Sequence, residues 1–377
     1  MRTRSACAAT ALAVLAVMVS ACGGDSGSSS DSGPIVFGME TSLSGPDAAF
    51  GTANRDGANL AVKQANEEGV LEDREVELQA EDDEARPEKA ASICKKFSTS
   101  AAVVFTAFSY TSIPCTEVLE GKRPQVTILA TSHVLTEEGN EWIFRIAVPD
   151  TKLAEDVLKY VKEQGWKRIA LTHVNDDFGN GAADSIKSAA EDMGLEMVAE
   201  EKYIAGDREF SAQLGKVKDA NPDVHLNWGN YAEAAALVKQ RENFGLDSVP
   251  YIESDAVATP EYPKLAGGAA EGVLYATHWS PTYDVPANAK FIKDFNAEYG
   301  HDPDLYATEA YTAALVSVEA IKKAGSTDPQ AVRDALAETS LDTPMGEITF
   351  DEKGDPTYGT FLVELLAGGK EKVIVGR

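Results

Sequence analysis

Strand-like and helix-like segments alternate along almost the whole chain, and this alternation limits the fold more than any other feature. The strand-like runs of the first part are Pro34–Gly38, Glu75–Asp82, Ala101–Phe108 and Gln125–Ala130. Between the first two lies Asn54–Gly69, which has helical character and ends on glycine, a common helix stop. Short apolar strands that alternate with helices are typical of a parallel sheet covered on both faces. The sequence therefore predicts an α/β fold.

The alternation resumes after Pro149 and continues through the middle of the chain. Apolar residues recur there at helical spacing, at Leu153, Val157, Leu158 and Val161. A strand-like run follows at Pro222–Gly229. From Cys22 onward about 356 residues remain, more than one core of about 250–300 residues usually holds. We therefore predict two doubly wound parallel-sheet lobes, and a single (β/α)₈ barrel is the alternative.

The N-terminus has the layout of a secretory signal. Arg2 and Arg4 precede an apolar run, which is too short for a membrane-spanning helix. The run ends in Val-Ser-Ala-Cys, which resembles the lipobox of bacterial lipoproteins, and a Gly/Ser/Asp tract follows. We predict a signal peptide at 1–21, a lipidated Cys22 and a flexible tether over 22–33. The alternative is an ordinary signal peptide with an incidental cysteine.

Net charge and cysteine content restrict the class of binding partner and indicate how the cysteines are used. The formal net charge is −27, and no basic patch is evident, which argues against nucleic-acid binding. With Cys7 in the signal and Cys22 assigned to lipid, Cys94 and Cys115 remain, an even pair in an exported protein. We predict a disulfide between them, and two free buried thiols are the alternative.

Motifs for catalysis are missing from the sequence. Its five histidines show no metal-ligand spacing, and no HExxH, GxSxG or P-loop motif is present, so we expect no enzyme, no metal and no cofactor. Polar clusters instead follow the predicted strands, where open α/β sheets bind ligands. They are Thr41–Gly51, Phe108–Pro114, Ala130–His133, 175–181, Gly229–Glu233 and Glu253–Ala256. Each cluster alone is explained by helix capping, but their recurrence predicts a ligand site.

Three stretches carry a family resemblance: "PIVFGMETSLSGPDAAFGTANRDGANLAVKQANEEGV", "VELQAEDDEARPEKA" and "MGEITFDEKGDP". They resemble the branched-chain amino acid type of ABC-transporter substrate-binding lipoproteins, the leucine/isoleucine/valine-binding family. The resemblance spans about Ile35 to Gly359. It implies the type I periplasmic-binding-protein fold, in which two lobes joined by three hinge crossings clamp a ligand. The crossings would lie near Ala147–Asp150, Ala276–Ser280 and Leu341–Met345. The lobes would then comprise 34–149 plus 279–343 and 150–278 plus 344–377.

The resemblance also implies a set of ligand-binding residues. Ser109 and Ser132 match hydroxyls that hold an amino acid's carboxylate, and the Ala130 carbonyl and Asp255 match groups that hold its ammonium. Aromatic positions around the ligand match Phe50, Phe178 and Tyr231. Tyr110 is bulkier than the small hydroxyl residues common at its position, and Thr131 and Ser132 depart from the usual small-residue run.

The implied function is delivery of a small amino acid, branched-chain or similar, to an ABC permease by hinge closure. We expect a monomer that is anchored by lipid to the outer face of the bacterial cytoplasmic membrane. Three alternatives remain. In the first, the same fold binds an amide, urea or a small aromatic acid. In the second, it acts as a ligand sensor for a membrane receptor. In the third, the chain is an anchored extracellular hydrolase.

Overall fold

The computed structural model describes residues 33–72, 74–137 and 139–376. The predicted signal peptide, the lipidated Cys22 and nearly all of the tether lie outside the described residues. Within the described part of the chain, no helix has the length and apolarity that crossing a membrane requires.

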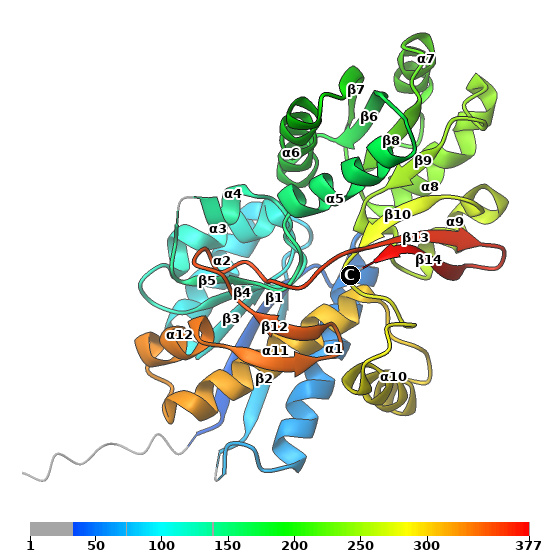
Figure 1. The fold of residues 1–377 in the computed structure, drawn as a ribbon. Helices are drawn as coiled ribbons and strands as arrows, with labels where there is room; N and C mark the ends of the chain where they lie inside the picture. Colours follow the sequence, from blue (N-terminus) through cyan, green and yellow to red (C-terminus); the bar gives the residue numbers. More distant parts are fainter. Residues whose placement is uncertain (1–32, 73, 138, 377) are drawn as a thin grey trace, which may run out of the picture. The chain divides into compact units, whose positions relative to one another are not determined.

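The first sheet is parallel and has the strand order β2-β1-β3-β4-β5 (Figure 1). Its strands are β1 (Ile35–Thr41), β2 (Val76–Asp82), β3 (Val103–Thr106), β4 (Gln125–Thr127) and β5 (Ile143–Arg145). In the register, Phe37 lies beside Leu78 on one side and Val103 on the other. Because β1 and β3 are apolar and buried almost throughout, they form the centre of a sheet that helices cover.

The second sheet has the order β14-β13-β10-β9-β8-β6-β7. Its parallel strands are β6 (Arg168–Val174), β7 (Glu196–Tyr203), β8 (Val224–Trp228), β9 (Tyr251–Glu253) and β10 (Leu274–Thr277). The end of the chain adds β13 (Phe361–Leu366) and β14 (Lys370–Gly376), which pair antiparallel. A separate hairpin joins β11 (Ser340–Thr343) to β12 (Gly346–Thr349). Two sheets confirm the predicted α/β fold class, and the single barrel is wrong.

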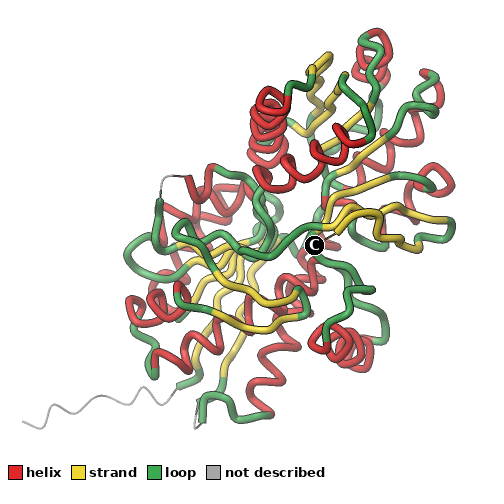
Figure 2. The backbone as a smooth tube through the Cα atoms, viewed as in Figure 1, coloured by secondary structure: helices red, strands yellow, loops and turns green. Residues whose placement is uncertain are grey.

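Helices connect successive strands, so that red helices flank the yellow strands in Figure 2. The longer helices are α1 (Ala48–Glu67), α2 (Pro87–Ser100), α3 (Ser109–Leu119), α5 (Asp150–Glu163), α6 (Asp177–Met193), α7 (Ser211–Asp219), α8 (Tyr231–Gln240), α10 (Pro286–Tyr299), α11 (Leu305–Ala324) and α12 (Pro329–Ala337). The shorter ones are α4 (Val134–Glu137), α9 (Glu261–Ala266), η1 (Arg241–Phe244), η2 (Asp255–Val257) and η3 (Gly267–Ala270).

Helices α1 and α11 pack together although some 250 residues separate them in the sequence. A glycine makes this close approach possible, because a Cβ atom on Gly57 would lie 2.0 Å from the Ala307 carbonyl oxygen. Backbone cannot yield to such a clash as a flexible side chain can. The pairing brings α11, from late in the chain, next to the first sheet.

Gly57→Ala is therefore expected to lower the free energy of unfolding by about 1–3 kcal/mol, despite the better helix propensity of alanine. Gly215 in α7 offers a matched control, because its Cβ would meet only Phe244, at 3.9 Å. Gly215→Ala should stabilise the protein by about 0.5–1 kcal/mol. Urea unfolding of both variants checks the contrast, and equal stabilities would contradict it.

The chain returns to the first sheet after α12. Phe350 packs on Phe144 with 5.2 Å between ring centroids, and the Gly354 carbonyl accepts a hydrogen bond of 2.8 Å from the Arg145 amide. Only then does the chain enter β13 of the second sheet (Figure 1). We therefore propose that the third crossing lies near 358–360, and not near 341–345.

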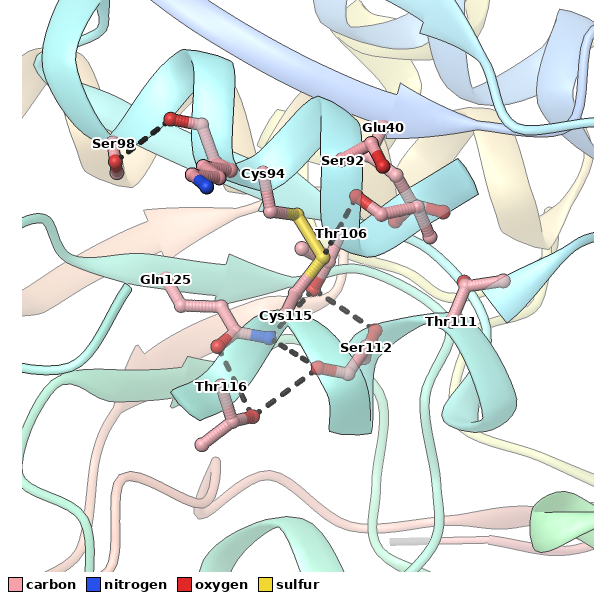
Figure 3. The surroundings of a disulfide bond; sticks show 12 residues. Glu40, Ser92, Cys94, Ser98, Thr106, Thr111, Ser112, Cys115, Thr116 and Gln125 are labelled. Atoms are coloured by element: carbon pink, nitrogen blue, oxygen red, sulfur yellow. Dashed lines mark hydrogen bonds between the residues drawn. A yellow bond between two sulfur atoms is a disulfide. The ribbon is translucent and has the colours of Figure 1, made fainter. Parts of the chain in front are cut away.

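The structure joins Cys94 of α2 to Cys115 of α3, as predicted, with 5.6 Å between their Cα atoms. Both cysteines are fully buried in a small apolar cluster with Phe97 and Leu119. A polar network lies beside the disulfide, where Ser112 and Gln125 both donate to the Thr106 hydroxyl (Figure 3). The bond thus ties together the two helices on this side of the first sheet, one of which begins at Ser109.

Candidate ligand-binding site

A small cavity of about 30 Å³ lies where the ends of both sheets supply residues. Its lining is Phe50, Phe108, Ser109, Tyr110, Leu129, Phe178, Asn230, Asp255, Ala256, Tyr306 and Glu309. Five of the predicted site residues are among them, namely Phe50, Ser109, Tyr110, Phe178 and Asp255. Larger hollows occur elsewhere on the surface, but this one lies at the carboxyl ends of the strands, where open α/β sheets bind ligands.

Aromatic rings form much of the cavity wall. Phe50 at the start of α1 meets the edges of three rings, with centroid distances of 5.6 Å to Phe108, 5.0 Å to Tyr231 and 4.5 Å to Tyr306. Phe108 also stacks on Tyr110 at 5.3 Å. Edge-on packing of this kind holds the rings in place and presents an apolar surface to a ligand. Tyr231 packs on Phe50 and is not among the residues that line the cavity.

The N-terminus of α3 forms part of the cavity wall. Ser109 is the first residue of this helix, and its hydroxyl accepts a hydrogen bond of 3.2 Å from the Ser132 amide. The Ser132 hydroxyl is fully buried and has no hydrogen-bond partner among the described residues. Because a helix N-terminus carries partial positive charge, this end of the cavity favours an anionic group.

A buried arginine, which the sequence analysis missed, fixes the loop after β4. The guanidinium of Arg145 donates to the carbonyls of Ala130 and Ser132, at 2.8 and 2.9 Å. It also forms an ion pair of 2.8 Å with Asp355. The Ala130 carbonyl, predicted to contact a ligand, thus already accepts from Arg145. Thr131 donates to Asp150 at 3.0 Å, so it positions the loop and does not line the cavity.

One part of the cavity lining, called here the acidic end, consists of carboxyl groups. Asp255 begins η2, with Ser254 between it and the end of β9, and the residue is 6% exposed. Burial, reinforced by the nearby Asp150 carboxylate, raises its pKa to about 8. Burial likewise raises the pKa of Glu309, on α11, well above its ordinary value. His278 lies between them, with Nε2 at 2.6 Å from Glu309 and Nδ1 at 4.0 Å from Asp255.

Sequence reasoning missed both Glu309 and His278. Glu309 lies inside a long helix that reads as ordinary amphipathic sequence, and its packing partner α1 lies far away in the sequence. One local signal was present, because a glutamate among alanines, threonines and tyrosines on a mostly buried helix needs a partner. Among the described residues there is no cluster of three or more residues suited to hold a metal ion.

Hydrogen bonds join the turn before α1 to Tyr110 and to residues that follow β8. The Asp47 carboxylate accepts from the Tyr110 hydroxyl at 2.8 Å and from the Asn230 amide at 3.3 Å. The Tyr231 hydroxyl donates to the Pro46 carbonyl at 3.1 Å. Since Asn230 and Tyr231 follow β8, these bonds link the two sheets' ends. Burial raises the pKa of Asp47 to about 6.

Known proteins match this architecture along nearly its whole length. A family model described as periplasmic binding protein matches residues 34–370. The Leucine-, isoleucine-, valine-, threonine-, and alanine-binding protein of Pseudomonas aeruginosa is 30% identical over 325 residues, which cover 85% of this chain and 87% of that protein.

Solved structures agree with this match. The branched-chain amino acid transporter substrate binding protein LivJ from Streptococcus pneumoniae, in complex with isoleucine, has a TM-score of 0.82 and 26% identity, and the match covers 91% of this chain and 99% of that one. A solute binding protein from R. palustris, in complex with benzoate, shares the fold, with a TM-score of 0.83, 22% identity and coverage of 91% and 96%. This chain belongs to the periplasmic binding protein family, whose members bind solutes and are not enzymes.

Proposed function

We propose that this chain is the solute-binding component of an ABC importer and binds a small amino acid, branched-chain or similar, in the cavity. The observation that carries the proposal is the polarity of that cavity. Its lining combines Ser109 at the N-terminus of α3, the Asp255 carboxyl and aromatic rings. An α-amino acid carries three kinds of group that match these, namely a carboxylate, an ammonium and a side chain.

The proposed mechanism is closure of two lobes, built on the two sheets, around the ligand. A ligand that contacts both Ser109 and Asp255 binds the closed form better than the open one, and this difference shifts the equilibrium. A permease would then recognise the closed form. We also propose that lipid on Cys22 anchors the protein outside the cytoplasmic membrane. Amino acid binding by the Pseudomonas aeruginosa relative, which its name states, supports the ligand class.

A second candidate ligand class is a small aromatic acid. It is favoured by the aromatic wall around Phe50 and by the benzoate bound to the R. palustris protein of the same fold. The buried Asp255 carboxyl opposes it, because an aromatic acid brings no cation to compensate that charge.

A thermal-shift screen of the protein, expressed from residue 34 onward, separates these ligand classes. Ligands are aliphatic amino acids, amides, urea and aromatic acids at millimolar concentration. A micromolar ligand at that concentration adds about 4 kcal/mol to the free energy of unfolding. We expect the shift with amino acids. A shift with aromatic acids or urea alone would refute the amino acid assignment, and turnover of the ligand would refute a transport role.

A further inference from the structure

The acidic end of the cavity contains more carboxyl groups than one ammonium requires. Asp255 and Glu309 both line the cavity, and their side chains come from different elements, η2 and α11. None of the described residues that line it is a lysine or an arginine. The Glu309 side chain is 1% exposed, and its Oε2 atom has no hydrogen-bond partner among the described residues. A buried carboxylate oxygen in this position calls for a donor from the ligand.

Counting protons gives the charge of this end. His278 and Glu309 lie 2.6 Å apart, which is hydrogen-bond distance. The pair is neutral when a protonated imidazole faces an ionised Glu309 or when both groups are uncharged, and it carries −1 when a neutral imidazole donates to the ionised carboxylate. Asp255, when ionised, then gives this end a charge of −1 or −2. A zwitterion adds no net charge to the cavity, whereas a monocation reduces the negative charge by one.

The carboxylates of Asp255 and Glu309 also repel each other, because both are buried and water does not screen their charges. The charge on Asp255 contributes to raising the pKa of Glu309, next after burial. Moving a positive group of the ligand between them relieves this repulsion and supplies the missing donor to Oε2 of Glu309. The repulsion is therefore a cost that a cationic ligand removes, as protonation of one of the two carboxyls also does.

We propose that Glu309 is a specificity-determining residue, positioned by His278, and that it makes the cavity select a small ligand with a net charge of +1. This inference rests on the proposed function and narrows its ligand class. Two kinds of molecule meet the requirement. One is an amine whose carboxylate is replaced by an amide, and the other is an amino acid with a second basic group.

The test uses isothermal titration calorimetry at pH 7.0 with leucine, leucinamide, ornithine and benzoate as probes. We expect leucinamide or ornithine to bind at least 10-fold more tightly than leucine. Tight leucinamide binding would show that the carboxylate is dispensable, and tight ornithine binding would place the second amine at Glu309. Glu309→Gln keeps the shape and should reduce the preference for the cation to less than about 3-fold. Glu319→Gln, on the same helix and 39% exposed, is the matched control and should leave the preference unchanged.

The outcomes separate this inference from the function on which it rests. Leucine binding as tightly as both cationic probes would overturn the inference and keep the amino acid assignment. An unchanged preference in Glu309→Gln would overturn the role of Glu309. Binding of benzoate alone, or of no probe, would overturn both the inference and the amino acid assignment. If Glu309→Gln fails to fold, the order of the four affinities in the unmodified protein still decides the charge preference.

Discussion

Asp255→Asn should weaken binding of an ammonium-bearing ligand by at least about 30-fold, the largest effect on affinity expected of any single substitution here. The ammonium would then be buried without its charge partner, and truncating one member of such a pair costs about 2–5 kcal/mol. Calorimetric titration with the best ligand of the screen measures the loss. Asp184→Asn removes the same charge from a side chain that is 65% exposed on α6, and it should bind as the unmodified protein does.

Asp255→Asn should also stabilise the protein when no ligand is added. The folded-state pKa of Asp255, about 8, lies above the ordinary value of 3.8, so the folded state binds this proton more tightly than the unfolded state does. Ionisation therefore destabilises the fold progressively as the pH rises from about 4 to 8. Asparagine removes a cost on the order of several kcal/mol at pH 8 and above. Equal melting temperatures for Asp255→Asn and the unmodified protein at pH 8, without ligand, would contradict this account.

Ligand affinity should rise with pH over the range in which stability falls, because both depend on the ionisation of Asp255. An ammonium binds the charged form of Asp255, so affinity should rise by up to about tenfold per pH unit from pH 6 until the pKa near 8 is reached. Asp255→Asn should lose this slope. A flat profile in the unmodified protein would mean that the ligand's cation lies elsewhere.

Removing the disulfide, by Cys94→Ala with Cys115→Ala, should lower the free energy of unfolding by about 3–4 kcal/mol. The bond closes a loop with a sequence separation of 21 residues, and the chain-entropy model assigns a cost of that size to its loss. Urea unfolding of the oxidised protein and the variant gives the difference. The free energy of ligand binding should fall by less than the free energy of unfolding, because α3 keeps its packing on α2 through Phe97 and Leu119.

Reductant provides the control for that comparison. It should destabilise the unmodified protein, expressed from residue 34 onward, and leave the doubly substituted protein unaffected. Oxidised and substituted proteins of equal stability would show that the loop is already constrained in the unfolded chain.

The fold was predictable because its signal is local. Apolar strands such as β3, and helices that begin or end at capping residues and glycines, leave their mark within ten or so residues. The cavity was predictable in part for the same reason, since Ser109 and Asp255 stand directly after strands. Parallel strands bring those positions to one edge, whatever their distance in the sequence.

The remaining parts of the site depend on contacts that no local pattern encodes. Glu309 reaches the cavity only because α11 packs on α1 at Gly57. Arg145 stands in the apolar run Trp142–Val148, which reads as buried strand, and its partner Asp355 is 210 residues away. The direction of a backbone carbonyl such as that of Ala130 has no sequence signal at all.

The partners of Arg145 also bear on when the binding loop can take its final form during folding. The Arg145 guanidinium holds the 130–132 loop through the Ala130 and Ser132 carbonyls, and its Nε atom donates to Asp355, which lies 210 residues further along the chain. Until that distant pair has formed, a cation that is fully buried in the finished fold has no counter-ion. The final orientation of the binding loop therefore depends on a contact of high sequence separation, and contacts of that kind slow folding.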